Sequence, residues 1–299
     1  MLETKPNMTI FILSISDSIF STHRLFEEGK KRGHDIKVIN YIKCLTTLET
    51  GKKMLFYNGR NIVNEPHAII PRIGVSVTQH GAAIVQEFES NNVYSTASAS
   101  GITVSQNKAQ SLQCLHKARL PIPKTVLSIN PDDINNQIRH LGGTPLIIKL
   151  LEGTQGKGVM LAETNQSAKS MIESLYSMNT PILLQEFIKE SQSEDIRVLV
   201  VDNTVVAAMK RKGPKNDFRS NIHLGGRGYP VQLTKEEEHI AIEAAQILNL
   251  AVAGVDIIRS KKGPLLMEVN STPGLQGIET FTKVNVAEYI IKHIENSCS

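Results

Sequence analysis

The sequence predicts an α/β protein built from three small units, and three observations lead to that prediction. The chain begins with a strand–helix–strand pattern, which is typical of a parallel sheet with crossover helices. Its later parts contain pairs of apolar runs joined by short turns, which indicate antiparallel hairpins. The length of 299 residues suffices for two or three domains.

The first unit is expected to be a parallel sheet covered by helices. Gly33 follows the first helical stretch, at a position where helices often end on a left-handed residue. The small-residue stretch 94–101 separates this unit from the next, so we place the first domain at residues 1–100. Its strands are expected at residues 8–16, 35–40 and 67–74, and its helices at 21–34 and 78–90.

The two following units are assigned to residues 101–190 and 191–299. One of their helices begins with a capping box, because Thr234 is followed three residues later by Glu237. The expected elements are helices at 105–118, 166–178 and 235–249, two strands joined by a glycine-rich loop at 144–163, a strand at 181–189, and hairpins at 195–212 (turning at Asp202-Asn203) and 252–270.

Composition and charge are those of an ordinary globular protein. Apolar residues make up 40% of the chain and charged residues 21%, and the formal net charge is +4. The basic residues form no single block, so nucleic-acid binding is not indicated; their densest cluster, residues 209–215, equally suits a solvated hairpin. The cysteines Cys44, Cys114 and Cys298 are far apart and lack CxxC spacing, which predicts neither a disulfide framework nor a zinc site.

The sequence also predicts a cytoplasmic protein. No apolar run approaches the roughly 20 residues that cross a bilayer, and the N-terminus lacks the apolar segment of a signal peptide. The unpaired cysteines fit a reducing compartment. We therefore expect no membrane partner and no direct nucleic-acid partner.

The last hairpin brings two carboxylates together. If a three-residue loop with Gly263 in the left-handed conformation pairs Ser260 with Pro264, the same register places Asp256 directly opposite Glu268. Paired residues have Cβ atoms about 4.5–5.5 Å apart. Asn270 lies two residues beyond Glu268, so its side chain points to the same face of the strand.

This hairpin face is a candidate metal site. Two carboxylates opposite each other repel and destabilise a hairpin unless a cation lies between them. Mg²⁺ suits two carboxylates and an amide oxygen, since it takes its remaining ligands from water and phosphate. The alternative is a surface hairpin with a solvated polar face, and a register shifted by one residue would separate the pair.

Two lysines occupy positions where their positive charges would be unfavourable without a nearby anion. Lys149 interrupts the apolar strand PLIIKLLEG, where an ammonium group needs a counter-ion or a route to water. If Ser105 is a helix N-cap, Lys108 lies in the first helical turn, where a cation opposes the helix dipole. A phosphate would relieve both conflicts, although snorkelling of Lys149 and plain exposure of Lys108 are the alternatives.

The loop EGTQGKG between two predicted strands is the third candidate phosphate-binding feature. Gly153, Gly156 and Gly158 would let backbone N–H groups approach an anion closely. The spacing matches neither GxGxxG nor GxxxxGK[ST], so Rossmann and Walker sites are disfavoured, and a flexible hairpin loop is the alternative. Lysines, loop and metal face together favour a nucleoside triphosphate.

At this point the chain resembles the ATP-grasp superfamily and, within it, the RimK-type glutamate ligases. The likeness extends from about Met8 to the C-terminus and includes IPRIG at residues 70–74. It implies a three-domain ATP-grasp fold, in which a parallel-sheet pre-ATP-grasp domain precedes two α+β subdomains that carry the glycine-rich lid and the metal site. The motifs that carry it, in order, are PLIIKLLEGTQGKGV, LLQEFIKES, DIRVLVV, DFRSNIHLGG, VAGVDIIR and LLMEVNSTPGLQGIE.

The resemblance also implies roles for individual residues. Lys108 and Lys149 would hold the ATP phosphates beneath a lid at residues 153–158, and the backbone around Glu186 and Ile188 would contact the adenine edge. Asp256, Glu268 and Asn270 would hold two Mg²⁺ (or Mn²⁺) ions. The other implied nucleotide-site positions are Gln185, Phe187, Lys189, Glu190, Asp195, Arg219, Ser220 and Asn221, with Glu190 and Asp195 on the ribose side.

The implied reaction is the ATP-dependent addition of glutamate to a carboxyl group. A carboxylate attacks the γ-phosphate of ATP, and the amino group of L-glutamate then attacks the resulting acylphosphate. We hypothesise that Arg197 and Arg211 stabilise the acylphosphate and the tetrahedral oxyanion; ordinary surface cations are the alternative. Arg72 and the segment 213–228 are candidates for the acceptor pocket, because they should border the cleft between domains.

Three functional hypotheses remain open on the sequence alone. The resemblance favours a ligase that extends the C-terminus of a ribosomal protein, the sixth of the small subunit, with glutamate. The second is the same chemistry on a pterin, a deazaflavin cofactor or a free amino acid. The third, a nucleotide-binding regulator without turnover, is disfavoured by the complete set of metal-ligand candidates. The resemblance further implies a homotetramer or dimer.

Overall fold

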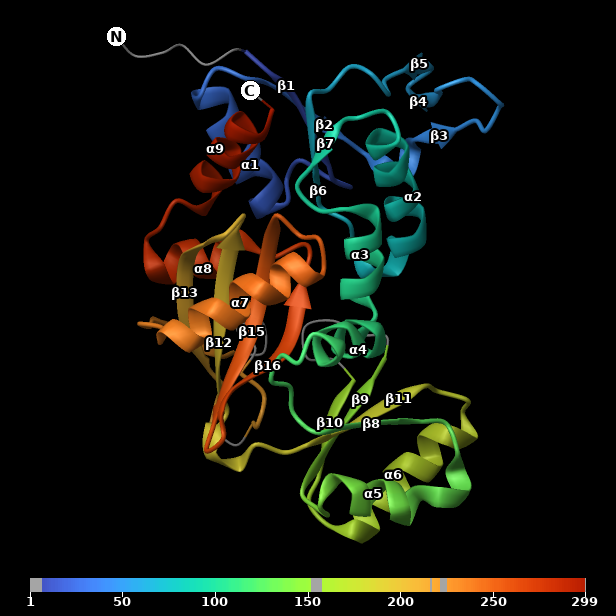
Figure 1. The fold of residues 1–299 in the computed structure, drawn as a ribbon, viewed down its shortest axis with the longest axis vertical. Helices are drawn as coiled ribbons and strands as arrows, with labels where there is room; N and C mark the ends of the chain where they lie inside the picture. The colour runs from blue at the N-terminus through green and yellow to red at the C-terminus, as the bar shows by residue number, and fades with distance from the viewer. Residues whose placement is uncertain (1–6, 152–157, 216, 221–224, 299) are drawn as a thin grey trace.

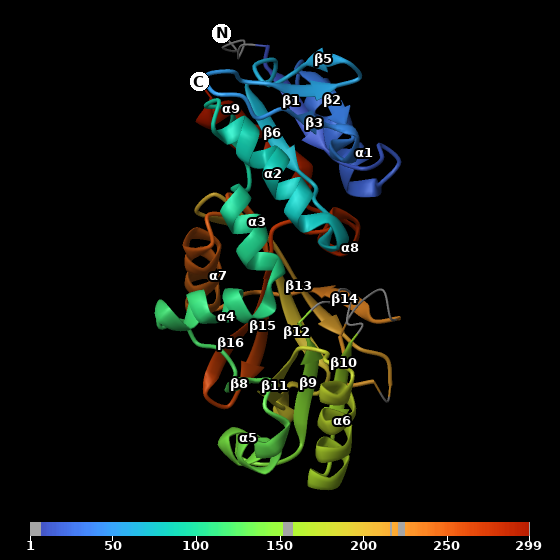
Figure 2. The same ribbon diagram turned by 90° about the vertical axis from the view of Figure 1, so that its right-hand side faces the viewer.

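The computed structural model describes residues 7–151, 158–215, 217–220 and 225–298. In these residues three units follow one another along an elongated molecule, with a parallel sheet at one end, a five-stranded sheet in the middle and a four-stranded antiparallel sheet at the other end (Figures 1 and 2). The mixture of a parallel sheet and two antiparallel sheets confirms the predicted fold class.

The N-terminal sheet is parallel, as predicted. Its strands follow the order β2-β1-β6-β7, and the helices α1 and α2 cover it. The first helix ends at Lys31, and Gly33 follows it with a φ of +89°, which fits the expected left-handed helix end. The bounds are β1 Thr9–Leu13, α1 Phe20–Lys31, β2 Asp35–Ile39, β6 Ala68–Pro71, α2 Thr78–Glu89 and β7 Tyr94–Ser95.

A small antiparallel sheet lies in the segment between β2 and β6, where no element was predicted. Its strands are only two or three residues long, too short to produce an alternating apolar pattern. Their bounds are β3 Leu45–Thr46, β4 Leu55–Tyr57 and β5 Arg60–Asn61.

The helix predicted at 105–118 is in fact two helices. These are α3, Ala99–Gln106, and α4, Lys108–Lys117, which meet at Asn107. Ser105 therefore lies inside α3, and the assignment of Ser105 as an N-cap was wrong. Asn107 caps α4 instead, since its side chain accepts a hydrogen bond from the Gln110 amide at 3.1 Å. Lys108 still lies in the first helical turn.

The second unit along the chain, which we call the central unit for its place in the sequence although it lies at one end of the molecule, is an antiparallel sheet with two helices on one face. The strand order is β10-β9-β11-β8, and Ile134, Ile138, Ala168 and Ile172 on the helices pack into a core with the sheet. The glycine-rich segment joins β9 to β10, as predicted. The bounds are β8 Thr125–Ser128, α5 Ile134–Leu141, β9 Leu146–Leu150, β10 Val159–Ala162, α6 Asn165–Ser177 and β11 Ile182–Glu186.

The five-stranded sheet has the order β14-β13-β12-β15-β16 and is antiparallel throughout. The helix α7 covers one face, and it begins with the predicted capping box between Thr234 and Glu237. The helices α8 and α9 follow the last strand. The bounds are β12 Glu194–Val201, β13 Thr204–Lys212, β14 Arg227–Pro230, α7 Lys235–Ile247, β15 Val252–Ser260, β16 Gly263–Asn270, α8 Leu275–Thr282 and α9 Val286–Ser297.

The last hairpin differs from its predicted register at the turn. The loop has two residues, so Ser260 pairs with Gly263, and the expected pairing of Ser260 with Pro264 was wrong. A bulge then leaves Met267 without a partner, because Ile257 pairs with Leu266 whereas Asp256 pairs with Glu268. The shorter turn and the extra residue cancel, so Asp256 lies opposite Glu268 as predicted.

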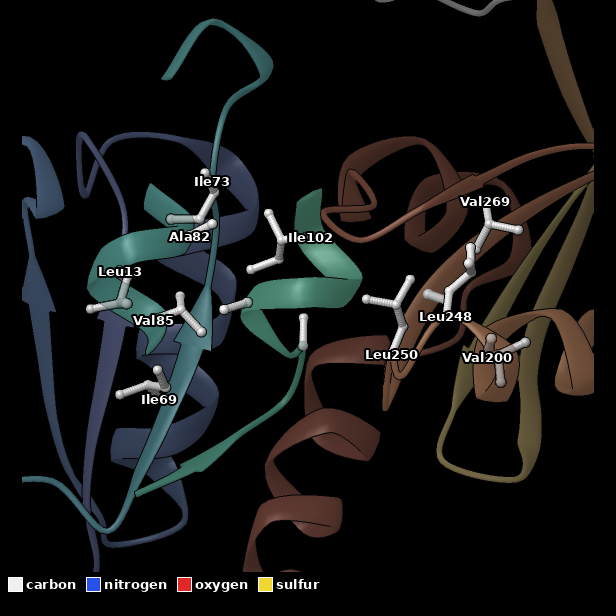
Figure 3. Close-up of a cluster of buried hydrophobic side chains, with 14 of the residues drawn as sticks. Leu13, Ile69, Ile73, Ala82, Val85, Ile102, Val200, Leu248, Leu250 and Val269 are labelled. Atoms are coloured by element: carbon white, nitrogen blue, oxygen red, sulfur yellow. The ribbon is translucent and has the colours of Figure 1, made fainter. Parts of the chain in front are cut away.

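The first and third units share a hydrophobic core. Leu13 and Ile69 of the parallel sheet belong to the same buried cluster as Val200, Leu248 and Val269 of the third unit, with Ile102 of α3 between them (Figure 3). The C-terminal helix adds a second link, because Glu295 accepts two 2.7 Å hydrogen bonds from Arg32 and contacts His34 at 2.9 Å. Among the described residues no helix is both long and apolar enough to span a membrane.

Candidate functional site

One face of the five-stranded sheet changes from apolar to charged along its strands. Near α8 and α9 this face carries Leu199, Val201 and Met209, which pack in a buried cluster with both helices. Beyond the helices, the register brings six polar residues onto the same face. We call this set the charged face: Asp195, Arg197, Arg211, Asp256, Glu268 and Asn270.

The strand pairings place these side chains together. Arg197 on β12 is the direct partner of Asp256 on β15, which is in turn the partner of Glu268 on β16. Asp195 is the partner of Arg211 on β13. Residues that pair directly, and residues two apart on one strand, point to the same side of a sheet, so the two arginines lie on the same face.

Asp256 is held by both arginines. Its side chain is buried, and its carboxylate accepts two hydrogen bonds from Arg197, one of them from Nη2 at 2.7 Å. Arg211 Nη2 approaches Asp256 Oδ2 to 2.9 Å. Burial alone would raise the pKa of Asp256, but the charges of Arg197 and Arg211 outweigh it and lower the pKa to about 2. The carboxylate is therefore ionised at neutral pH.

Arg211 links Asp256 to a second carboxylate. It donates two hydrogen bonds to Asp195, at 2.7 and 2.6 Å, and Ser220 donates a third to the same carboxylate. Burial lowers the pKa of Arg211, but the attraction of Asp256 and Asp195 outweighs it and raises the pKa above its ordinary value. The row Arg197–Asp256–Arg211–Asp195 alternates in sign, which stabilises charges that would be costly to bury singly.

Two lysines, Lys108 at the start of α4 and Lys149 on β9, interact with the charge of Glu268 on the charged face. Burial lowers the pKa of both Lys108 and Lys149, and the negative charge of Glu268 opposes that shift in each case. For Lys149 the pKa falls to about 8. Glu268 is exposed and Asn270 half-buried, so both remain accessible to a ligand held between the units.

Lys149 is positioned by a hydrogen bond that the sequence did not predict. Its Nζ donates to Gln185 Oε1 at 2.6 Å, and Gln185 Nε2 donates to Thr125 Oγ1 at 3.0 Å. Gln185 is fully buried on β11, the strand next to β9. Its side chain therefore does not face solvent, and it fixes the direction of the Lys149 side chain. No sequence pattern distinguished Thr125 from other strand threonines.

The charged face offers the donors that a hard divalent cation requires. Asp256 and Glu268 supply carboxylate oxygens, and Asn270 supplies an amide oxygen that accepts the Thr272 amide at 2.8 Å. The described residues contain no group of three or more His, Cys, Asp or Glu side chains that could hold a metal ion, so the candidate site consists of two carboxylates and the Asn270 amide. Two carboxylates, an amide and facing lysines fit Mg²⁺ with phosphate ligands.

The residues implied for the adenine and ribose lie along the segment between the central and third units. The Glu186 amide donates to Lys124 O at 2.9 Å, so this N–H already has a protein acceptor. Glu190 accepts the Lys261 amide at 2.9 Å, which ties the segment to the tip of the last hairpin. Phe187 and Ile188 continue the segment and Lys189 begins its short 3₁₀ helix.

The remaining implied residues are only partly described. Arg219 is paired with Asp217, its Nη2 donating at 2.8 Å, and lies one residue before Ser220. Gly158 closes the glycine-rich segment with a φ of +73°, a backbone conformation that favours glycine. Gly153, Gly156 and Asn221 lie outside the described residues.

Two family models match most of the chain. The model of the RimK-like ATP-grasp domain matches residues 105–294, and the model of the RimK PreATP-grasp domain matches residues 8–102. The chain is 46% identical over 290 residues to a probable alpha-L-glutamate ligase of Marinomonas sp. (strain MWYL1), covering 97% of this chain and 96% of that protein. A probable alpha-L-glutamate ligase of Coxiella burnetii (strain RSA 493 / Nine Mile phase I) is 47% identical over the same shares.

Solved structures share the fold at low sequence identity. The ATP-grasp ligase PsnB, complexed with a phosphomimetic variant of its minimal precursor, Mg and ADP, superposes with a TM-score of 0.76 at 18% identity. The alignment covers 98% of this chain and 99% of that chain. A RimK domain protein from Sphaerobacter thermophilus DSM 20745 has a TM-score of 0.68 at 18% identity over 95% and 98% of the two chains. At such identities the likeness shows the fold alone.

Proposed function

The chain belongs to the RimK-like ATP-grasp family, and from that premise we propose that it is an ATP-dependent alpha-L-glutamate ligase that adds glutamate to the C-terminus of a ribosomal protein. Its relatives named probable alpha-L-glutamate ligase match along nearly their whole length, which supports the glutamate donor and the ADP-forming ligase class. The ribosomal acceptor, the sixth protein of the small subunit, rests on the sequence resemblance.

The observation that carries the proposal is the pairing of Asp256 with Glu268, with Asn270 beside them and the two central-unit lysines nearby. A carboxylate pair and nearby ammonium groups suit a metal-bound triphosphate. The carboxylates would balance the positive charge of the metal, and the ammonium groups would balance the negative charge of the phosphates. Arg197 and Arg211 compensate Asp256, whereas Glu268 is exposed beside it and could bind a cation together with Asn270.

The chain's residues have distinct roles in the proposed reaction. Lys108 and Lys149 would bind the phosphates of ATP, and Asp256, Glu268 and Asn270 would hold Mg²⁺ or Mn²⁺, which when bound would neutralise phosphate charge. Arg197 and Arg211, which both contact Asp256, would orient the carboxylate that attacks the γ-phosphate and would stabilise the acylphosphate and the tetrahedral oxyanion. The glutamate amine then displaces phosphate from the acyl carbon.

Binding of the metal would also change the arginine contacts. In the structure the guanidinium groups of Arg197 and Arg211 neutralise Asp256. A divalent cation on Asp256 would compete with them, which would free their N–H donors for the reacting carboxylate. This exchange would keep the buried carboxylate compensated both with and without ligand.

A second candidate is the same chemistry on a small acceptor. Some solved relatives of the fold act on other substrates, such as the D-cycloserine synthetase DcsG at 13% identity. A regulatory nucleotide-binding role without turnover is the third hypothesis, and the complete set of Asp256, Glu268 and Asn270 argues against it. The ATP site is common to all three, so only the products distinguish them.

Turnover assays test the proposal. Release of ADP is measured with Mg-ATP, L-glutamate and either the purified ribosomal protein or a small acceptor, and the products are analysed by mass spectrometry. We expect ADP together with glutamyl-sized mass increments on the protein C-terminus. ADP with glutamate added only to a small acceptor would favour the second candidate. No ADP under any combination would favour the regulator.

A further inference from the structure

Buried polar atoms without partners gather where the first unit meets the end of β16. Among the described residues, four buried side-chain polar atoms lack a hydrogen-bond partner, and three of them are Arg72 Nε, Ser271 Oγ and Thr272 Oγ1. Arg72 contacts this segment directly, because its Nη2 donates to Pro273 O at 2.9 Å. Buried polar groups are nearly always satisfied in folded proteins, so a local group of three is a candidate binding site for a polar ligand.

Arg72 is a cation without a counter-ion in the described part of the chain. It follows β6 directly, and its amide donates to Leu13 O at 2.9 Å, which fixes its backbone at the carboxyl edge of the parallel sheet. Burial lowers the pKa of Arg72 to about 10, and no carboxylate offsets that effect. A guanidinium group in such surroundings is expected to bind an anion, most favourably a planar carboxylate that accepts two hydrogen bonds.

The group of unpaired atoms adjoins the charged face. Asn270 ends β16, and Ser271 and Thr272 follow it immediately. Pro273 packs over Gly254, since an ideal Cβ on that glycine would lie 2.8 Å from Pro273 Cβ and 3.5 Å from Arg197 Cδ. Pro273 therefore lies close to Arg197, and its carbonyl accepts a hydrogen bond from Arg72. The unpaired atoms of Arg72, Ser271 and Thr272 are thus next to the proposed reaction centre.

We propose that Arg72, Ser271 and Thr272 form a subsite for a carboxylate of the incoming L-glutamate. This carboxylate does not react and remains free in the product. The guanidinium Nε and the two hydroxyl groups supply hydrogen-bond donors, and the positive charge balances the carboxylate. The inference rests on the proposed function, because it assigns a residue set to the amino-acid substrate of that same reaction.

The other anions of the reaction have better sites elsewhere. The ATP phosphates would meet Lys108 and Lys149 on the central unit, and the reacting carboxylate would meet Arg197 and Arg211. Arg72 belongs to the first unit and donates to Pro273 O, three residues beyond the end of β16 at Asn270. Only the second substrate, which carries two carboxylates that do not react, still requires a cation.

Binding of L-glutamate to the protein saturated with Mg-AMPPNP tests the subsite. Calorimetry is carried out on the wild type, Arg72→Ala, Ser271→Ala and Thr272→Val, with Arg60→Ala as the matched control. Arg60 lies in the same unit, but its side chain is exposed and forms a single 3.4 Å ion pair with Glu65. We expect the affinity for glutamate to fall about 10-fold to 100-fold in Arg72→Ala and to remain unchanged in Arg60→Ala.

The hydroxyl variants separate a binding role from a structural one. Ser271 Oγ and Thr272 Oγ1 have no protein partner, so removing them should leave the thermal midpoint at or above that of the wild type. Weaker glutamate binding at an unchanged midpoint, with unchanged affinity for AMPPNP, supports the subsite. Glutamate affinity equal to that of the wild type in Arg72→Ala and both hydroxyl variants overturns it.

Analogues identify the carboxylate and separate this inference from the proposed function. The γ-amide L-glutamine and the α-amide of glutamate each lack one carboxylate. We expect the analogue without the recognised carboxylate to bind the wild type and Arg72→Ala equally well. If Arg72→Ala weakens both analogues as much as glutamate, the subsite is wrong. If the wild type binds no glutamate at all, the proposed function fails with it.

Discussion

Asp256 lies directly opposite Glu268 because a bulge at Met267 compensates for a turn that is one residue shorter than a three-residue loop. Without the bulge, the two-residue turn would place Asp256 opposite Met267 and would send the Glu268 side chain to the apolar face. The bulge thus aims a carboxylate at the charged face, as bulges near active sites often do.

Replacement of the shared carboxylate is expected to affect both activity and stability. Asp256→Asn leaves Arg197 and Arg211 without their common buried counter-ion, which should lower the free energy of unfolding by about 3 kcal/mol. It should also reduce Mg²⁺-dependent ADP formation by at least about 100-fold, since a proposed metal ligand is lost. Urea denaturation and steady-state ADP release measure the two effects.

Asp35→Asn serves as the control for Asp256→Asn. Asp35 is half-exposed at its side chain and forms a 3.5 Å ion pair with Lys30 on the surface. Surface pairs contribute about 1 kcal/mol or less, so both stability and turnover should stay close to wild type. Wild-type activity in Asp256→Asn would contradict its role in the site.

The ionisation of Lys149 should appear in the pH dependence of nucleotide binding. Burial lowers the pKa of Lys149 to about 8, so the ammonium form that attracts phosphate decreases as the pH rises through 8 in the free protein. We expect AMPPNP affinity to fall from pH 7.5 to pH 9.5 by about 10-fold in the wild type. In Lys149→Arg this dependence should be much weaker, because arginine stays charged and only Lys108, whose pKa is also lowered by burial, still titrates.

The same group gives a prediction for stability in the absence of ligand. The pKa of Lys149 is lower in the folded chain than in the unfolded chain, so the unfolded state binds more protons between about pH 8 and the ordinary lysine value of 10.5. The contribution of Lys149 to the free energy of unfolding therefore rises with pH across that window. A wild-type curve with the same slope as Lys149→Met would contradict the shift.

Gly254 should tolerate no side chain. An added Cβ would come within 2.8 Å of Pro273 Cβ, and proline can yield little. Gly254→Ala should therefore displace the Pro273 turn, lower the free energy of unfolding by about 1–3 kcal/mol and reduce glutamate incorporation. In Gly74→Ala, where the nearest atom is Tyr41 Oη at 3.9 Å, the free energy of unfolding should change little.

The contacts of Glu295 between the C-terminal helix and the first unit should contribute to the stability of the fold. Glu295 is buried and hydrogen-bonded to Arg32, with His34 at 2.9 Å. Glu295→Ala removes the carboxylate from both, which should lower the free energy of unfolding by about 3 kcal/mol. The control Glu288→Ala on the same helix, which is partly exposed and pairs with Lys292, should cost about 1 kcal/mol or less. Equal costs would contradict the role of the buried network.

The sequence predicted the elements whose patterns are local. The parallel opening of the first sheet, the turn at Asp202-Asn203 and the capping box at Thr234 all follow from periodicity or from residues a few positions apart. The pairing of Asp256 with Glu268 was also predicted, but for the wrong reason. The turn is one residue shorter than assumed, and an unforeseen bulge restores the pairing.

Features that depend on tertiary contacts could not be predicted in this way. The break at Asn107 was hidden because small residues before it do not reveal the start of a helix. The two strong arginine–carboxylate pairs and the Lys149–Gln185 hydrogen bond join residues on different strands. Nothing in the sequence around Gln185 shows that its side chain, rather than its backbone, supports the site.

The most direct test of the account is the binding of Mn²⁺ to the protein in the presence of AMPPNP, measured by electron paramagnetic resonance. We expect two nucleotide-dependent Mn²⁺ ions per chain in the wild type, and loss of at least one of them in Glu268→Ala and in Asn270→Ala. Wild-type protein that binds AMPPNP without Mn²⁺, or variants that bind Mn²⁺ as tightly as the wild type, would contradict the assignment of the charged face as the metal–nucleotide site.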